Sequence, residues 1–173
     1  VTGQCGNAER VCPPVDRPKA AVYRFAPTGA YEGVFATVDD RRPWSGWQDE
    51  AVRLAAAPAR GRLFVARYDP PRVEAYDTAT GRALFAAAAP QAPPLDQVQA
   101  LAARPDGGFA LLLGFSDNPR LDRPPFGQVV QFLPDGTPSR RLVIRSETDP
   151  AFWSAARLAA DDTGRAHVLV PDA

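Results

Sequence analysis

The sequence predicts an all-β protein built from antiparallel four-stranded units. Two observations support this: a hairpin-like phrase occurs three times, and a second phrase, Leu-Ala-Ala followed by a glycine turn, also occurs three times. The two phrases alternate along the chain, and each recurs after about 50 residues, the period of radial β-repeats. Four antiparallel strands per unit at that period are typical of the blades of a β-propeller.

The first phrase reads "VYRFAPTGAYEGVFA" (22–36), "VEAYDTATGRALFAA" (73–87) and "VVQFLPDGTPSRRLVI" (129–144). In each copy a valine is followed three residues later by an aromatic residue, then by a turn ending in glycine and a second apolar run. Pro and Asp favour such turns, and glycine accepts the positive φ they require. Each copy therefore predicts a β-hairpin.

The second phrase reads "LAAAPARGRLFVA" (54–66), "LAARPDGGFALLL" (101–113) and "LAADDTGRAHVLV" (158–170). Its first half also contains good helix formers, so "DEAVRLAAAPA" (49–59) and "LDQVQALAARP" (95–105) are alternatively short helices in an α/β repeat. We favour strands because each Leu-Ala-Ala lies directly before a tight glycine turn.

Taken in order, these phrases predict complete blades at about residues 52–89 and 98–145, with half blades at 20–36 and 156–173. This makes about three blade equivalents, fewer than the roughly four to eight that close a ring. An open arc would expose strand edges, which proteins usually cover. We therefore expect the chain to be part of a longer propeller, to pair with a second copy in a six-bladed ring, or to be capped by a partner.

The stretch "LAAAPARGRLFVA" followed by "VEAYDTATGR" resembles the six- to eight-bladed propellers of the NHL and YVTN repeat type. The resemblance covers about residues 20–173, which we expect to form one propeller-like domain preceded by a cysteine-containing strap at 1–19. It implies a fold but not an activity, because such families include scaffolds, ligand binders and hydrolases.

The composition limits the choice of partners. Twenty basic and twenty acidic residues give a net charge of zero, which argues against a nucleic-acid partner. No apolar run approaches the roughly 20 residues of a membrane helix. The sequence contains no Met, so we expect either that a leader has been removed or that the chain is a piece of a longer one. Cys5 and Cys12 are the only cysteines and predict a small disulfide loop in an exported, periplasmic or extracellular protein.

The loops between strands predict a binding face. In a meander the tight glycine turns lie at one end of the strands, and the longer loops, at 37–51, 87–97, 115–127 and 146–155, lie at the other. Trp and Arg are frequent in protein interfaces. We expect Trp47 and Trp153, however, to pack between blades rather than to bind a partner. The candidate binding residues on this loop face are Trp44, Arg41, Arg42, Arg120, Arg123 and Phe126.

The sequence shows no catalytic signature, and we expect no cofactor and no metal. His167 is the only histidine, and its position in an alternating strand predicts a polar-face residue. We therefore expect a non-enzymatic subunit that contacts other proteins. The alternatives are a sugar- or peptide-binding module around Trp44, or a calcium-dependent hydrolase or lactonase that uses loop carboxylates. Those carboxylates are Asp39, Asp40, Asp49, Glu50, Asp117 and Asp122, whereas Asp106, Asp135, Asp161 and Asp162 are expected to form turns.

Overall fold

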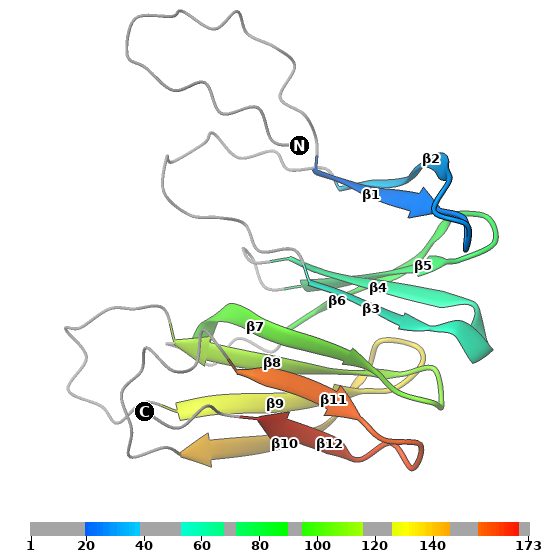
Figure 1. The fold of residues 1–173 in the computed structure, drawn as a ribbon. Helices are drawn as coiled ribbons and strands as arrows, with labels where there is room; N and C mark the ends of the chain where they lie inside the picture. Colours follow the sequence, from blue (N-terminus) through cyan, green and yellow to red (C-terminus); the bar gives the residue numbers. More distant parts are fainter. Residues whose placement is uncertain are drawn as a thin grey trace, which may run out of the picture. The chain divides into compact units, whose positions relative to one another are not determined.

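The computed structural model describes residues 20–38, 53–67, 72–89, 95–115, 126–145 and 156–169. These residues form antiparallel strands and one 3₁₀ turn, η1 (Pro58–Arg60) (Figure 1). The chain divides into two compact units, Val1–Gly46 and Trp47–Ala173. The hairpin at 20–38 falls in the first unit, and the predicted propeller-like domain at 20–173 stays a prediction. The strap at 1–19 lies outside the described residues and stays a prediction.

In the first unit, the described residues 20–38 form a hairpin of β1 (Ala20–Phe25) and β2 (Tyr31–Val38). Its turn is closed by the amide of Gly29, which donates to the carbonyl of Ala26 at 2.8 Å. The register places Phe25 opposite Tyr31. This is the hairpin predicted by the first phrase.

The described residues of the second unit form two four-stranded antiparallel sheets and one two-stranded sheet. Strands occupy Arg53–Ala57 and Leu95–Ala103, where the α/β alternative placed helices, so the all-β prediction is confirmed. The first blade contains β3 (Arg53–Ala57), β4 (Arg62–Arg67), β5 (Arg72–Asp77) and β6 (Ala83–Ala88). The second blade contains β7 (Leu95–Ala103), β8 (Phe109–Phe115), β9 (Phe126–Phe132) and β10 (Pro138–Arg145). The half-blade contains β11 (Arg157–Ala160) and β12 (Ala166–Leu169).

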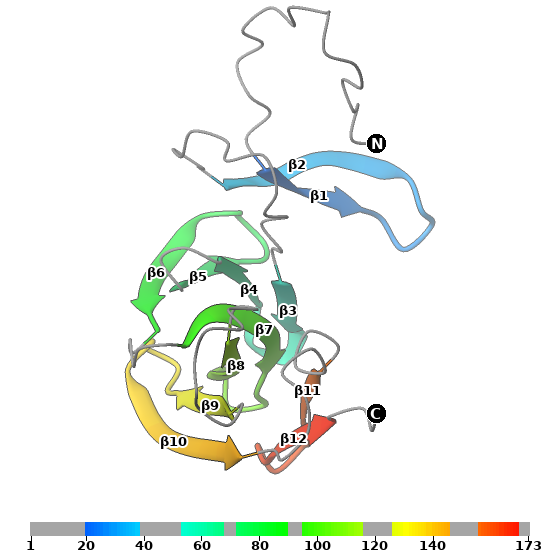
Figure 2. The same cartoon turned by 90° about the vertical axis from the view of Figure 1, so that its left-hand side faces the viewer.

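The sheets of the second unit are arranged as propeller blades. Strand β3 contacts β7, and β7 contacts β11, so the first strands of successive blades lie side by side. Figure 2 shows β3, β7 and β11 on the inside, with β6 and β10 on the outside of their sheets. The described blades are two complete ones and the inner half of a third, which is an incomplete propeller.

The main core lies between the first and second blades. Apolar residues alternate along the strands of both sheets. Because successive side chains of a strand point to opposite faces, these apolar side chains share one face of each sheet and are buried there. Phe109 and Phe132 stack with ring centroids 4.4 Å apart, and Phe64 lies 4.9 Å from Phe109. All three phenylalanines are fully buried.

A smaller core lies between the second blade and the half-blade. Ala110, Leu112 and Val129 are buried there, with Leu158 and Val168 of the half-blade packed against them. The second blade is therefore covered on parts of both faces, by the first blade on one face and by β11 and β12 on the other.

The strand registers show which residues occupy the same place in each repeat. The leucine of the second phrase always pairs with an aliphatic residue of the next strand: Leu54 with Val65, Leu101 with Leu111, and Leu158 with Val168. The aromatic residue of the first phrase lies at the end of its strand before the turn: Phe25 and Phe132 are the last residues of β1 and β9, and Tyr76 is the residue before the last of β5. Equivalent positions can therefore be compared directly.

Candidate functional site

The half-blade has an open strand edge. Strands β4 and β8 each pair on both sides, with β5 and β9 respectively on the outer side. Within the described ranges, β12 pairs with β11 alone. An open edge presents main-chain donors and acceptors to another strand. We call β12, with its exposed Leu169, together with the exposed Leu142 of β10, the half-blade site.

Leu169 is exposed although its repeat position is otherwise buried. By register it matches Ala66 of the first blade and Leu112 of the second. The side chains of Ala66 and Leu112 are fully buried, whereas Leu169 is 65% exposed. The first two are covered by the blade that follows theirs in the chain. Leu169 points toward the position of a following blade.

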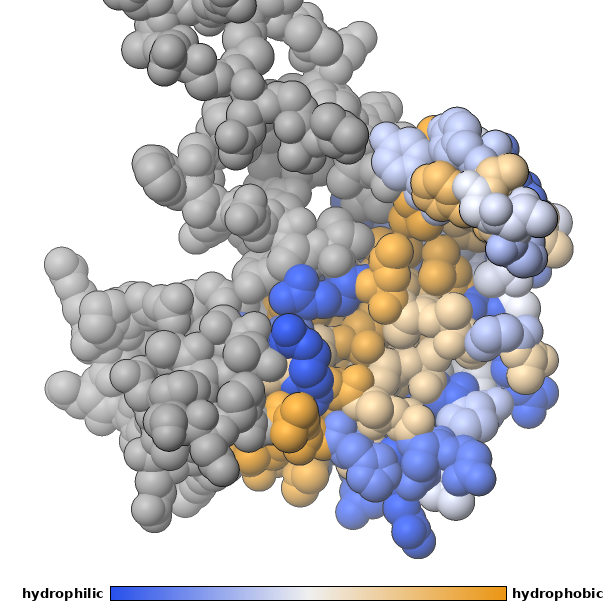
Figure 3. Space-filling view, viewed as in Figure 1, coloured by the Kyte–Doolittle hydropathy of each residue, from blue (hydrophilic) through white to orange (hydrophobic). Residues whose placement is uncertain are grey.

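Leu142 on β10 shows the same contrast. It pairs with Val129 as Ala87 pairs with Val73, so Leu142 and Ala87 are equivalent. Ala87 is 6% exposed because the second blade covers it, but Leu142 is 56% exposed. The half-blade supplies only β11 and β12 to this face. The space-filling view shows apolar side chains at the surface beside a hydrophilic cluster (Figure 3).

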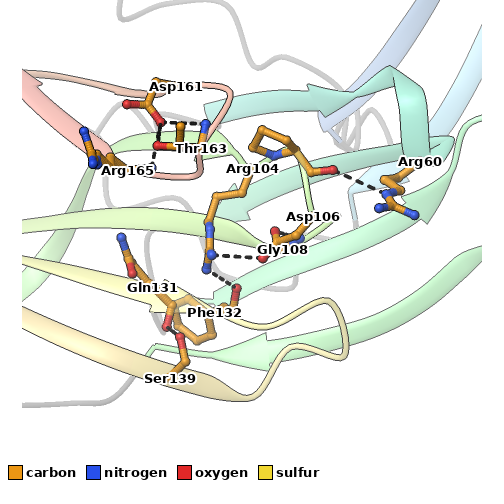
Figure 4. A network of polar contacts seen from close by, with 12 residues as sticks. Arg60, Arg104, Asp106, Gly108, Gln131, Phe132, Ser139, Asp161, Thr163 and Arg165 are labelled. Atoms are coloured by element: carbon orange, nitrogen blue, oxygen red, sulfur yellow. Dashed lines mark hydrogen bonds and ion pairs between the residues drawn. The ribbon is translucent and has the colours of Figure 1, made fainter.

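The turn between β11 and β12 is held by Asp161. One oxygen of its carboxylate accepts hydrogen bonds from the amides of Thr163 and Arg165, each at 2.9 Å, and the other lies 2.9 Å from His167 Nε2. The hydrogen bond from His167 and then that from Thr163 hold the pKa of Asp161 far below its ordinary value. Figure 4 shows the Thr163 and Arg165 contacts.

The turn prediction is confirmed for Asp106 and Asp135 as well. Asp106 accepts a hydrogen bond from the amide of Gly108 at 2.9 Å, and Asp135 accepts one from Thr137 at 2.8 Å. His167 is an exposed residue of β12, as the alternating pattern predicted.

Arginine side chains link the first blade to the second. Arg53 Nε donates to the carbonyl of Gln99 at 2.9 Å, which joins β3 to β7. Arg60 Nε donates to Pro105 at 3.3 Å (Figure 4). Arg62 Nη1 donates to the carbonyls of Gly107, at 3.0 Å, and Pro134. These bonds hold the strands and turns of the first blade against those of the second.

A charged cluster lies on the face of the first blade opposite the main core. The carboxylate of Glu74 lies 3.3 Å from Arg67 and 3.2 Å from Arg72, and it accepts a 2.7 Å hydrogen bond from Tyr76. Burial, followed by the hydrogen bond to Glu74, raises the pKa of Tyr76 to about 12. The sequence analysis missed this Glu74 cluster, although "RYDPPRVEAY" places charged residues on either side of a loop in an otherwise apolar hairpin.

An exposed aromatic cluster lies on the hairpin of the first unit. The ring of Tyr31 lies 5.7 Å from that of Phe25 and 6.1 Å from that of Tyr23. All three side chains are more than half exposed. The sequence indicated the pattern of this hairpin but not the exposure of its aromatic residues.

Most of the predicted binding residues lie outside the described residues. Phe126 is the exception: it begins β9 and pairs through its main chain with Arg145. The remaining predicted residues, and the loop carboxylates and two further tryptophans, stay predictions. They are Trp44, Arg41, Arg42, Arg120, Arg123, Cys5, Cys12, Trp47, Trp153, Asp39, Asp40, Asp49, Glu50, Asp117 and Asp122.

The described ranges show neither a metal-ligand cluster nor a membrane helix. No three His, Cys, Asp or Glu side chains are grouped there in an arrangement suited to a metal ion. No helix formed by these ranges is long and apolar enough to cross a bilayer.

Comparisons with known proteins show the fold and no activity. No family model matches the chain, and no curated protein matches it. Among solved structures, a protein of unknown function from Bacteroides caccae is similar at 14% sequence identity, with a TM-score of 0.51. The match covers 83% of this chain and 43% of that one, so the chain spans less than half of the structure it matches.

Proposed function

We propose that this chain is a non-enzymatic β-propeller module that contacts another protein, as a structural or accessory subunit of a larger assembly. We further propose that its repeats are of the NHL/YVTN type. The observation that supports protein contact is the half-blade site. Leu169 is mostly exposed, whereas the equivalent Leu112 is fully buried beneath a neighbouring blade.

The chemistry of this site suits a protein partner better than a small ligand. Hydrogen-bonding groups along β12 favour the addition of another strand. The apolar side chains of Leu142 and Leu169 favour contact with a second apolar surface. A partner that adds strands beside β12 would satisfy the edge and cover Leu142, and a further blade of that partner would cover Leu169.

Export is a separate part of the proposal and rests on Cys5 and Cys12. In an oxidising compartment the pair forms a disulfide. Thiol labelling of protein taken from its native source, denatured without reductant, is then expected to detect no free cysteine. Labelling of both cysteines would contradict export while leaving the protein-contact proposal intact.

Hydrogen exchange tests the protein contact. We expect the amides of Ala166–Leu169 that point away from β11 to exchange slowly in assemblies isolated from the native source and faster in the purified chain at high dilution. The matched control is Leu111–Leu113 on β8, which lies between two paired strands and should be protected in both samples. Equal, fast exchange of the β12 amides in both samples would overturn the proposal.

A further inference from the structure

We propose that the half-blade site binds the β1–β2 hairpin of a second copy of this chain, so that two copies complete each other's blades. This inference rests on the proposed function and names the partner. The sequence suggested a two-copy ring as one of several options; the registers and exposures in the structure now specify the strand, its register and the surfaces that meet.

The hairpin β1–β2 is the segment that matches the missing outer half of the blade. It shares the first phrase with β5–β6 and β9–β10, which supply the outer halves of the complete blades. In both complete blades the first strand of this hairpin pairs with the second strand of the inner pair. By the same rule β1 pairs with β12.

Both complete blades predict the same register for this pairing. Leu63 lies opposite Tyr76 in the first blade, and Phe109 lies opposite Phe132 in the second. The equivalent pair is Ala166 with Phe25 of the second copy. Two residues along the strands, Val65 lies opposite Glu74 and Leu111 opposite Val130. The equivalent pair there is Val168 with Tyr23.

The surfaces that would meet are exposed on both sides. Phe132 is fully buried, because its blade packs on the one before it, whereas the equivalent Phe25 is 60% exposed. A Cβ atom built on Gly136 would lie 2.8 Å from Phe85 of the first blade, but one built on Gly29 would meet nothing within 4 Å. In the paired dimer the aromatic cluster of β1–β2 covers the exposed Leu142.

Blade number favours a second copy over pairing within one chain. The described strands of each chain form two complete blades, one inner half and one outer half. Joining the halves within one chain gives three blades, below the roughly four to eight that close a ring. Reciprocal exchange between two copies gives six blades around a two-fold axis, with the same contact made twice.

The test combines native mass with cysteine cross-linking. The full chain is expected to have twice the 18.6 kDa mass of one copy in native mass spectrometry. In a background carrying Cys5→Ser and Cys12→Ser, a tagged Val168→Cys chain and a differently tagged Tyr23→Cys chain are mixed, refolded together and oxidised. A disulfide-linked species carrying both tags is expected, since directly opposed side chains lie within reach of a disulfide.

The matched control replaces Tyr23→Cys with Arg24→Cys, which shifts the cysteine by one residue to the other face of β1 and should not cross-link. If the chains carrying Val168→Cys or Tyr23→Cys do not fold, the same cross-linking experiment uses Ala166→Cys and Phe25→Cys. A monomer without cross-links, or a cross-link formed only within single chains of a Tyr23→Cys/Val168→Cys double variant, would overturn the proposal. In either case, slow exchange of β12 in native assemblies that contain another polypeptide would leave the proposed function standing.

Discussion

Tyr76 donates a 2.7 Å hydrogen bond from its hydroxyl group to the carboxylate of Glu74, on the same face of β5. The phenol is shielded from solvent and lies beside a negative charge, and both effects disfavour the phenolate. Burial, the hydrogen bond and the charge of Glu74 together raise the pKa of Tyr76 to about 12. Arg67 and Arg72 oppose this rise but do not cancel it.

This relationship predicts a loss of stability in alkaline solution. In the unfolded chain the pKa of Tyr76 is about 10, so above that pH the unfolded state binds fewer protons than the folded state. The contribution of Tyr76 is therefore fully present below about pH 10 and is lost as the pH rises toward 12. Urea unfolding at several pH values should show a weaker alkaline loss in Tyr76→Phe than in the unsubstituted chain.

Glu74→Gln tests the cause of the same effect. Without the carboxylate the negative charge is gone, and the pKa of Tyr76 should move part of the way back toward 10, since burial remains. Spectrophotometric titration, with Tyr76→Phe as the difference standard, measures this change. An identical titration of Tyr76 with and without the Glu74 carboxylate would rule out the proposed coupling.

The hydrogen bonds of Arg62 predict that this side chain stabilises the packing of the first blade against the second. Its guanidinium donates to the carbonyls of Gly107 and Pro134, in two different turns of the second blade. Arg62→Ala leaves both carbonyls without this donor and should lower the free energy of unfolding by about 2 kcal/mol. Lysine keeps the charge but lacks the planar fork, so Arg62→Lys should recover only part of the loss.

The control for Arg62 is Arg82→Ala, at an exposed residue of a turn in the same blade. Its effect on unfolding should stay within about 0.5 kcal/mol. Denaturant midpoints at constant slope measure both variants. Equal effects of Arg62→Ala and Arg82→Ala would show that the bonds between the turns contribute little to stability.

The burial of Phe132 predicts that removing its ring lowers the stability of the main core. Phe132 is fully buried and stacks on Phe109 at 4.4 Å. Phe132→Ala removes the ring and leaves a cavity, which should lower the free energy of unfolding by about 3–5 kcal/mol. Leu133→Ala, at the next residue, removes an exposed side chain and should cost less than about 0.5 kcal/mol. Similar losses in the two variants would mean that the blades do not pack as described.

The hairpins could be predicted from the sequence because their signals are local. A turn that requires glycine at residue 81 or 136, between two apolar runs, determines a hairpin without help from the rest of the chain. The repeat then indicated which hairpins belong to one blade. The start of β7 was less predictable: it begins at Leu95 rather than near 98, and its pairing contains irregularities on either side of Val98.

The candidate site could not be predicted because it depends on what covers each residue. Phe25 and Phe132 occupy the same position of the same phrase, and only the packing of neighbouring blades makes one exposed and the other buried. The Glu74 cluster needs the register of β4 with β5, which brings Arg67 and Glu74 together across a loop. The loop residues around Trp44 lie outside the described residues, so the predicted loop face remains a prediction.

The contacts of Asp161 predict that the half-blade loses stability in acid. The carboxylate of Asp161 accepts hydrogen bonds from Thr163 and Arg165 and contacts His167, and these interactions hold its pKa well below the ordinary value. A lowered folded-state pKa gives stability that is present above the unfolded-state pKa of about 4 and is lost as the pH falls. The stability difference between the unsubstituted chain and Asp161→Asn should therefore be present above about pH 4 and shrink as the pH falls further. Asp162→Asn, in the same turn, is the control, and urea unfolding across this pH range measures all three chains. A difference that stays constant from neutral to acidic pH would show that the charge of Asp161 does not stabilise the turn.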